Sequence, residues 1–159
     1  MSIAYLNGAW QPLEETRIPV LDRGFLFGDG VYEVIPVYSG KPFRLKRHLE
    51  RLENNLAAIR IDKPLSHEEW DAIIQRLIED HGPVDQALYL QVTRGAYPIR
   101  RHPIPREVHP NVIAFTSLNP THDAAEMARG SGGKHLALDE ALTAIIRAWS
   151  ALRSEIELT

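Results

Sequence analysis

Three glycines stand among acidic and aromatic residues in the stretch DRGFLFGDGVYE, residues 22–33. Glycine is used where the backbone turns through positive φ or approaches a ligand closely, so this spacing indicates the edge of an active site. Tyr32 lies in the alternating run that follows, and its ring shares one strand face with Val34. The phenol could therefore face a ligand. A glycine-rich hairpin with a half-buried tyrosine is the alternative, and residue types alone favour it.

Cationic side chains at two further places could bind anions. Arg51 lies in HLERL, residues 48–52, beside the apolar stripe of an expected helix, from where its guanidinium could hold a phosphate through two hydrogen bonds. The alternative for Arg51 is a solvated surface arginine. Arg100, Arg101 and His102 cluster in a proline-rich loop, and prolines lower the entropy cost of holding a loop in one shape. A plain solvated basic loop would have the same composition.

Three strings, DRGFLFGDGVYE, HLERL and QVTRG at residues 91–95, resemble in order and spacing the class IV pyridoxal-phosphate aminotransferases of fold type IV. Within that family the similarity is to the D-amino-acid (D-alanine) aminotransferases, and it runs from about Tyr5 to about Pro120. The resemblance implies transfer of an amino group from a D-amino acid to a 2-oxo acid. It also implies pyridoxal 5'-phosphate as the cofactor and a homodimer.

The resemblance gives each anion-binding candidate a role. It assigns Arg51 to the cofactor phosphate. It assigns Tyr32, Arg100 and His102 to the substrate carboxylate, with the loop reaching across from the partner subunit. The loop is one residue longer than the commonest family form, so Arg101 could take the place of Arg100.

The resemblance further implies a Schiff-base lysine about 25–30 residues beyond Asn119-Pro120, where this chain has none. The family pattern also continues into a larger domain. We therefore expect a truncated chain that departs from the pattern near Ala128–Ser131, with no catalytic residue of its own and with its activity open. The lysines of the chain are Lys41, Lys46, Lys63 and Lys134.

Two other functional interpretations remain open. A non-catalytic remnant or interaction domain is favoured by the missing lysine. A different activity of the same fold type, that of a branched-chain aminotransferase or an aminodeoxychorismate lyase, is the second, and the R-x-H pattern of Arg100 and His102 weighs against it.

Composition excludes several classes of function. The chain has 159 residues, a formal net charge of -3 at pH 7 and a pI near 6.2, which is no footprint for nucleic acid. No apolar run is long enough for a membrane span. Cysteine is absent, which excludes disulfides and thiolate metal sites, and the histidines lack a metal-binding spacing. These features predict a cytoplasmic protein without a nucleic-acid, membrane or metal partner.

The order of elements predicts an α+β fold, a small and mainly antiparallel sheet with two helices on one face. A C-terminal amphipathic helix follows a glycine-rich join. We expect a small N-terminal domain over residues 1–120 and a divergent tail over 121–159. Arg94 and Gly95 follow a strand, where a turn explains them adequately. The expected strands are 3–6, 9–10, 31–38, 87–93 and 112–116, and the expected helices are 44–60, 66–81 and 135–158.

Overall fold

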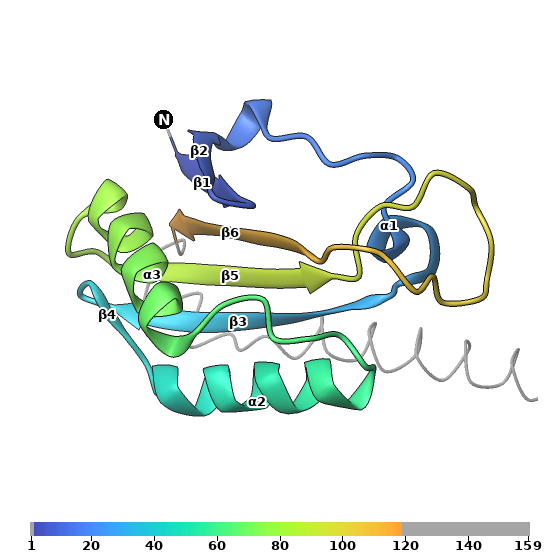
Figure 1. The fold of residues 1–159 in the computed structure, drawn as a ribbon. Coiled ribbons are helices and arrows are strands. Elements are labelled where there is room, and N and C mark those ends of the chain that lie inside the picture. The colour runs from blue at the N-terminus through green and yellow to red at the C-terminus, as the bar shows by residue number, and fades with distance from the viewer. Residues whose placement is uncertain (1, 119–159) are drawn as a thin grey trace, which may run out of the picture. The chain divides into compact units, whose positions relative to one another are not determined.

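The structure, a computed structural model, describes residues 2–118 and contains one six-stranded antiparallel sheet with the strand order β2-β1-β6-β5-β3-β4 (Figure 1). This confirms the α+β class and the antiparallel sheet. The helix expected over 135–158 lies outside the described residues, and the domain division expected after residue 120 stays a prediction. The elements are β1 (Ile3–Leu6), β2 (Ala9–Pro12), a short 3-10 helix (Leu13–Glu15), α1 (Arg23–Phe27), β3 (Gly30–Tyr38), β4 (Lys41–Pro42), α2 (Leu45–Ala58), α3 (His67–His81), β5 (Gln86–Thr93) and β6 (Asn111–Leu118).

The two long helices and one face of the sheet enclose the hydrophobic core. Helix α2 runs along β3, and α3 contacts β1, β5 and β6 (Figure 1). Ile35 of β3 is paired in register with Leu88 of β5, and both side chains are fully buried. The helices add apolar stripes that include Leu52 and Trp70. Each side chain of this kind contributes about 1.5–3 kcal/mol to stability when it is fully buried.

The opposite face of the sheet, here called the open face, carries no helix within residues 2–118. Tyr32 and Val34 of β3 point to it, and they are 62% and 46% exposed. Tyr89 of β5 lies on the same face because it is paired in register with Val34. Phe115 of β6 is paired with Tyr89 in the same way. The open face is therefore lined with aromatic rings.

Helix α1 and the loop of residues 95–110 lie at the end of the sheet where β3 begins (Figure 1). Asp22 is the N-cap of α1, and its side chain accepts a hydrogen bond from the backbone N of Gly24 at 2.7 Å. An added Cβ at Gly24 would lie 2.3 Å from Cγ2 of Thr93, so no side chain fits there. Gly28 ends the helix in the left-handed region, with a φ of 65°. Gly24 therefore serves close packing against Thr93, and Gly28 serves a turn.

Candidate functional site

Glu33 is a buried carboxylate between the sheet and α2, with 1% of its side chain exposed. Nε of Arg51 donates to its Oε1 at 2.6 Å, and Nδ1 of His48 lies 2.8 Å from its Oε2. Burial raises the pKa of Glu33, but the hydrogen bonds from Arg51 and His48 outweigh burial, so the pKa lies below its ordinary value. The carboxylate is therefore held by two residues one turn apart on α2.

Arg51 is fixed on one side and open on the other. Its Nε and Nη2 bind both oxygens of Glu33, which sets the orientation of the planar guanidinium. Its side chain is nevertheless 62% exposed, and Nη1 makes no hydrogen bond within the described part of the chain. A guanidinium that is already oriented loses little further entropy when it binds an anion. Arg51 therefore differs from a freely moving surface arginine.

Tyr32 stands in an aromatic stack on the open face. Its ring centroid lies 5.8 Å from that of Tyr89, with 15° between the ring planes, and Tyr89 stacks in turn on Phe115 at 5.0 Å. The hydroxyl of Tyr89 donates to Oε1 of Gln91 at 3.3 Å. Burial, and to a smaller extent Tyr32, raises the pKa of Tyr89, so this phenol is a neutral hydrogen-bond donor at neutral pH.

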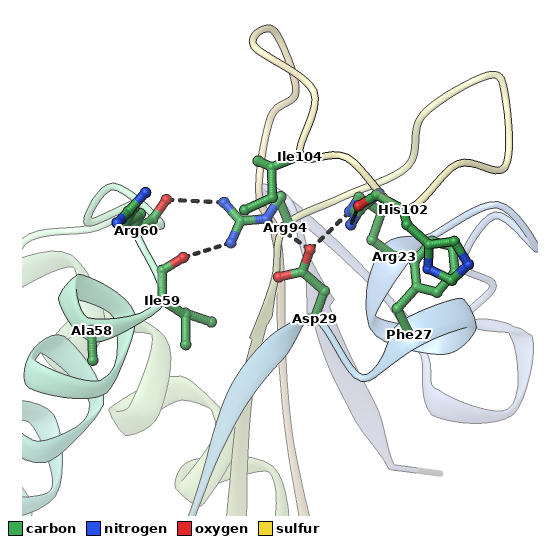
Figure 2. A pocket seen from close by; sticks show the side chains of 9 residues that line it. All are labelled: Arg23, Phe27, Asp29, Ala58, Ile59, Arg60, Arg94, His102 and Ile104. Atoms are coloured by element: carbon green, nitrogen blue, oxygen red, sulfur yellow. Dashed lines mark hydrogen bonds and ion pairs between the residues drawn. The ribbon is translucent and has the colours of Figure 1, made fainter. Parts of the chain in front are cut away.

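Asp29 joins Arg23 of α1 to Arg94 at the end of β5 (Figure 2). Nε of each arginine lies 2.8 Å from Oδ2 of Asp29, and both arginine side chains are 6% exposed. Arg94 also donates to the carbonyl oxygens of Ile59 and Arg60, just beyond α2, at 2.6 and 2.9 Å. Burial raises the pKa of Asp29, but the hydrogen bonds from the two arginines outweigh burial, so the pKa lies below its ordinary value. The explanation of Arg94 as part of a turn was incomplete, because the residue is a buried link to α2.

The cationic loop places Arg100 and His102 against one ring, that of Phe27. Cζ of Arg100 lies 5.1 Å from the centroid of this ring, and the imidazole centroid of His102 lies 5.0 Å from it. Arg101 lies instead over the ring of Tyr97, with Cζ at 5.4 Å. Arg100 and His102 therefore share a contact with Phe27, whereas Arg101 contacts Tyr97.

An open cavity of about 550 Å³ lies between this loop and the end of α2 (Figure 2). Among the four predicted site residues, only His102 lines it. Within one chain Arg100 and His102 both contact Phe27, whereas Tyr32 lies on the open face and Arg51 on α2. The roles assigned to these residues stay predictions. The lining residues are Arg23, Phe27, Asp29, Ala58, Ile59, Arg60, Arg94, His102 and Ile104.

Sequence reasoning did not single out Tyr89, Arg23 or Asp29. The signal for Tyr89 is the pairing of β3 with β5, which places it beside Tyr32. Arg23 and Asp29 are both in the string DRGFLFGDGVYE, and their opposite charges were the available signal.

Comparisons of the sequence with known proteins identify its relatives. The family model of amino-transferase class IV matches residues 30–152, more than half of the chain. The D-alanine aminotransferase of Staphylococcus epidermidis is 38% identical over 117 residues, which are 73% of this chain and 41% of that relative. The chain thus spans about two fifths of the length of this curated relative. The family match runs past Ala128–Ser131, and the departure expected there stays a prediction.

Solved structures show the same arrangement of sheet and helices. The 4-amino-4-deoxychorismate lyase from Pseudomonas aeruginosa has a TM-score of 0.63 and 30% identity, with 80% of this chain and 44% of that one covered. A T.th. branched-chain amino acid aminotransferase with pyridoxamine 5'-phosphate has a TM-score of 0.65 and 26% identity, with 76% and 41% covered.

Proposed function

Because this chain belongs to the class IV aminotransferases, we propose that it supplies the anion-holding part of a D-amino-acid aminotransferase. Such an enzyme transfers an amino group from a D-amino acid to a 2-oxo acid with pyridoxal 5'-phosphate as cofactor. The chain spans less than half the length of these relatives, so the proposal concerns binding groups rather than the whole reaction. The observation that carries it is the exposed guanidinium of Arg51, fixed by buried Glu33.

The chemistry of Arg51 fits the phosphate of the cofactor. The phosphate is a dianion, and Nη1 of Arg51 is a donor that faces no competing carboxylate oxygen, because Glu33 binds the Nε and Nη2 side. When bound, pyridoxal phosphate supplies the electron sink for amino-group transfer. The part of this chain is to anchor and orient that group.

Arg100 and His102 are the proposed ligands of the substrate carboxylate, together with Tyr32. Their shared contact with Phe27 supports Arg100 over Arg101 for this role. Neither Tyr32 nor Arg100 lines the cavity that His102 lines in one chain. The proposal therefore includes a homodimer, in which the loop of one subunit meets Tyr32 of the other.

A D-amino acid is the proposed substrate rather than a branched-chain amino acid or aminodeoxychorismate. Identity to the D-alanine aminotransferase is 38%, whereas the lyase and the branched-chain enzyme reach 30% and 26%. The R-x-H pattern of Arg100 and His102, which resembles that of the D-amino-acid group, supports the same choice.

A second candidate function, a non-catalytic domain that associates with longer relatives, is favoured by the positions of the lysines. Lys46 and Lys63 pair with glutamates of α2, and Lys41 lies in the short edge strand β4. None of these three makes a hydrogen bond or ion pair with the proposed site residues in the described part of the chain. Lys134 lies outside the described residues.

The cellular location of the protein was predicted from its composition. None of the helices between residues 2 and 118 has the length and apolar character needed to cross a membrane. The cytoplasmic location predicted from composition stays a prediction.

Calorimetric titration of the full chain with pyridoxal 5'-phosphate tests the proposed function. We expect binding, and we expect Arg51→Ala to weaken it by about 1.5–3 kcal/mol, because one charged hydrogen-bond donor is lost. Arg47→Ala is the matched control, since Arg47 is an exposed arginine one turn earlier on α2. Unchanged affinity in Arg51→Ala would return this residue to the single role of neutralising Glu33.

Borohydride reduction of the same mixture separates the two candidate functions. Covalent attachment of the cofactor to one lysine, located by mass spectrometry, would support a catalytic chain. Binding without attachment would support the anchoring role alone.

A further inference from the structure

The loop of residues 95–110 has its backbone attachments at two places. At its start, the backbone N of Arg23 donates to the carbonyl of Gly95 at 2.9 Å, and the N of Tyr97 donates to the carbonyl of Leu21 at 3.4 Å. At its tip, the attachment comes from a side chain. Nη1 of Arg23 donates to the carbonyl of Arg101 at 2.8 Å, and Nη2 donates to the carbonyl of His102 at 3.1 Å.

Arg23 itself is held rigidly. Its Nε donates to Asp29, so all three guanidinium nitrogens of Arg23 make hydrogen bonds, and the residue is 5% exposed. Asp29 binds Arg94 through the same oxygen, and Arg94 binds the carbonyls of Ile59 and Arg60. The tip of the loop is therefore tied, through two arginines and one carboxylate, to the end of the helix that carries the phosphate-binding candidate (Figure 2).

The hydrogen bonds from Arg23 to the loop backbone also fix the positions from which the side chains of Arg100 and His102 extend. Arg23, Arg100 and His102 all contact the ring of Phe27, with Cζ of Arg23 at 4.8 Å from its centroid. The two carbonyls that Arg23 binds belong to Arg101, which follows Arg100 in the chain, and to His102 itself. Moving them would move both side chains relative to this ring.

We infer that Arg23 is a positioning residue, which holds the loop tip so that the side chains of Arg100 and His102 both lie against the ring of Phe27. What these two groups bind rests on the proposed function, whereas the holding of the loop does not. Arg23 touches neither substrate nor cofactor in this inference; it acts through the backbone of the loop.

Arg23→Lys in the full chain tests the inference, because lysine keeps a positive charge beside Asp29 but has no planar fork for the two carbonyls. Trypsin cleavage after Arg100 and Arg101, followed by mass spectrometry, reports the loop. Cleavage after Lys46 in α2 reports general unfolding. We expect loop cleavage to rise about tenfold or more, with cleavage after Lys46 and the melting temperature close to wild type.

Arg17→Gln is the control, because Arg17 is an exposed arginine that also donates to backbone carbonyls, those of Glu14 and Thr16. It should leave loop cleavage unchanged. Loop cleavage that stays at the wild-type rate in Arg23→Lys, or that rises only in step with cleavage after Lys46, would overturn the positioning role.

Pyruvate binding is monitored by saturation-transfer NMR. A purely structural role of Arg23 would leave this binding unchanged. We expect Arg23→Lys to weaken pyruvate binding about tenfold while the melting temperature is retained. If the wild-type chain binds no pyruvate, the proposed carboxylate site fails, and the cleavage result still decides whether Arg23 positions the loop. Wild-type pyruvate affinity in Arg23→Lys, with the loop loosened, would show that holding the tip does not serve the site.

Discussion

Glu33 and Asp29 follow the same physical rule, in which arginines from other elements compensate a carboxylate that the fold removes from water. Glu33 receives Arg51 from α2, and Asp29 receives Arg23 and Arg94. A buried charge without such partners would cost several kcal/mol. Glu33 and Asp29 therefore orient arginines, and among these arginines Arg51 keeps an exposed guanidinium.

The lowered pKa of Glu33 predicts a loss of stability in acid. A carboxyl whose pKa is lower in the folded chain stabilises the fold above its unfolded pKa, about 4.3, and that contribution is lost as the pH falls through the lower folded value. We expect Glu33→Gln to be less stable than wild type at pH 7, by about 1–3 kcal/mol, and to lose less stability on acidification. Urea unfolding between pH 7 and pH 3 measures both.

Glu14→Gln is the control for this prediction, because Glu14 is exposed and lies in the short 3-10 helix. It should follow the wild-type curve. Equal acid sensitivity in Glu33→Gln and wild type would show that the Glu33 pair does not govern the acid response, and would leave Asp29, whose pKa is also lowered, as the next candidate.

The sequence predicted the strand face of a residue correctly where the alternation of side chains along one strand determines that face. The face of Tyr32 follows from its position relative to Val34. The partners of Glu33 and Asp29 did not follow, because 18 residues separate Arg51 from Glu33 and 65 separate Arg94 from Asp29. Only the folded topology determines which acid meets which arginine.

Among the elements, those set by local chemistry were predicted well. Asn7 and Gly8 have φ angles of 51° and 92°, as a type I′ turn requires, and they join β1 to β2. The capping box of α3 is present, with Ser66 and Glu69 bonding each other's backbone N. The stack of Tyr32 on Tyr89 was not predicted, because β3 and β5 are separated in sequence by two helices and their register is not a local property.

The capping box gives a prediction at the scale of the helix. Ser66→Ala removes the acceptor for the backbone N of Glu69, which lies 3.2 Å from the serine hydroxyl, and should lower the free energy of unfolding by about 1 kcal/mol. Chemical denaturation measures the change. Ser117→Ala in β6 is exposed and caps no helix, so it should have little effect. A loss in Ser117→Ala as large as in Ser66→Ala would contradict the capping explanation.

At the scale of the whole molecule, the described residues form a six-stranded sheet with a hydrophobic core on one face and an aromatic open face on the other. The chain spans about two fifths of its curated relative, and the predicted anion-binding residues do not share one cavity in a single copy. We propose that Arg51, oriented by Glu33, is an anion-binding group that this chain already holds in place.

The most direct test of that claim compares the affinity of the full chain for pyridoxal 5'-phosphate with its affinity for pyridoxal, which lacks the phosphate. We predict that wild type prefers the phosphorylated compound by about tenfold or more, and that Arg51→Ala removes most of the preference while Arg47→Ala keeps it. Equal affinity of wild type for the two compounds, or a preference that survives in Arg51→Ala, would contradict the claim.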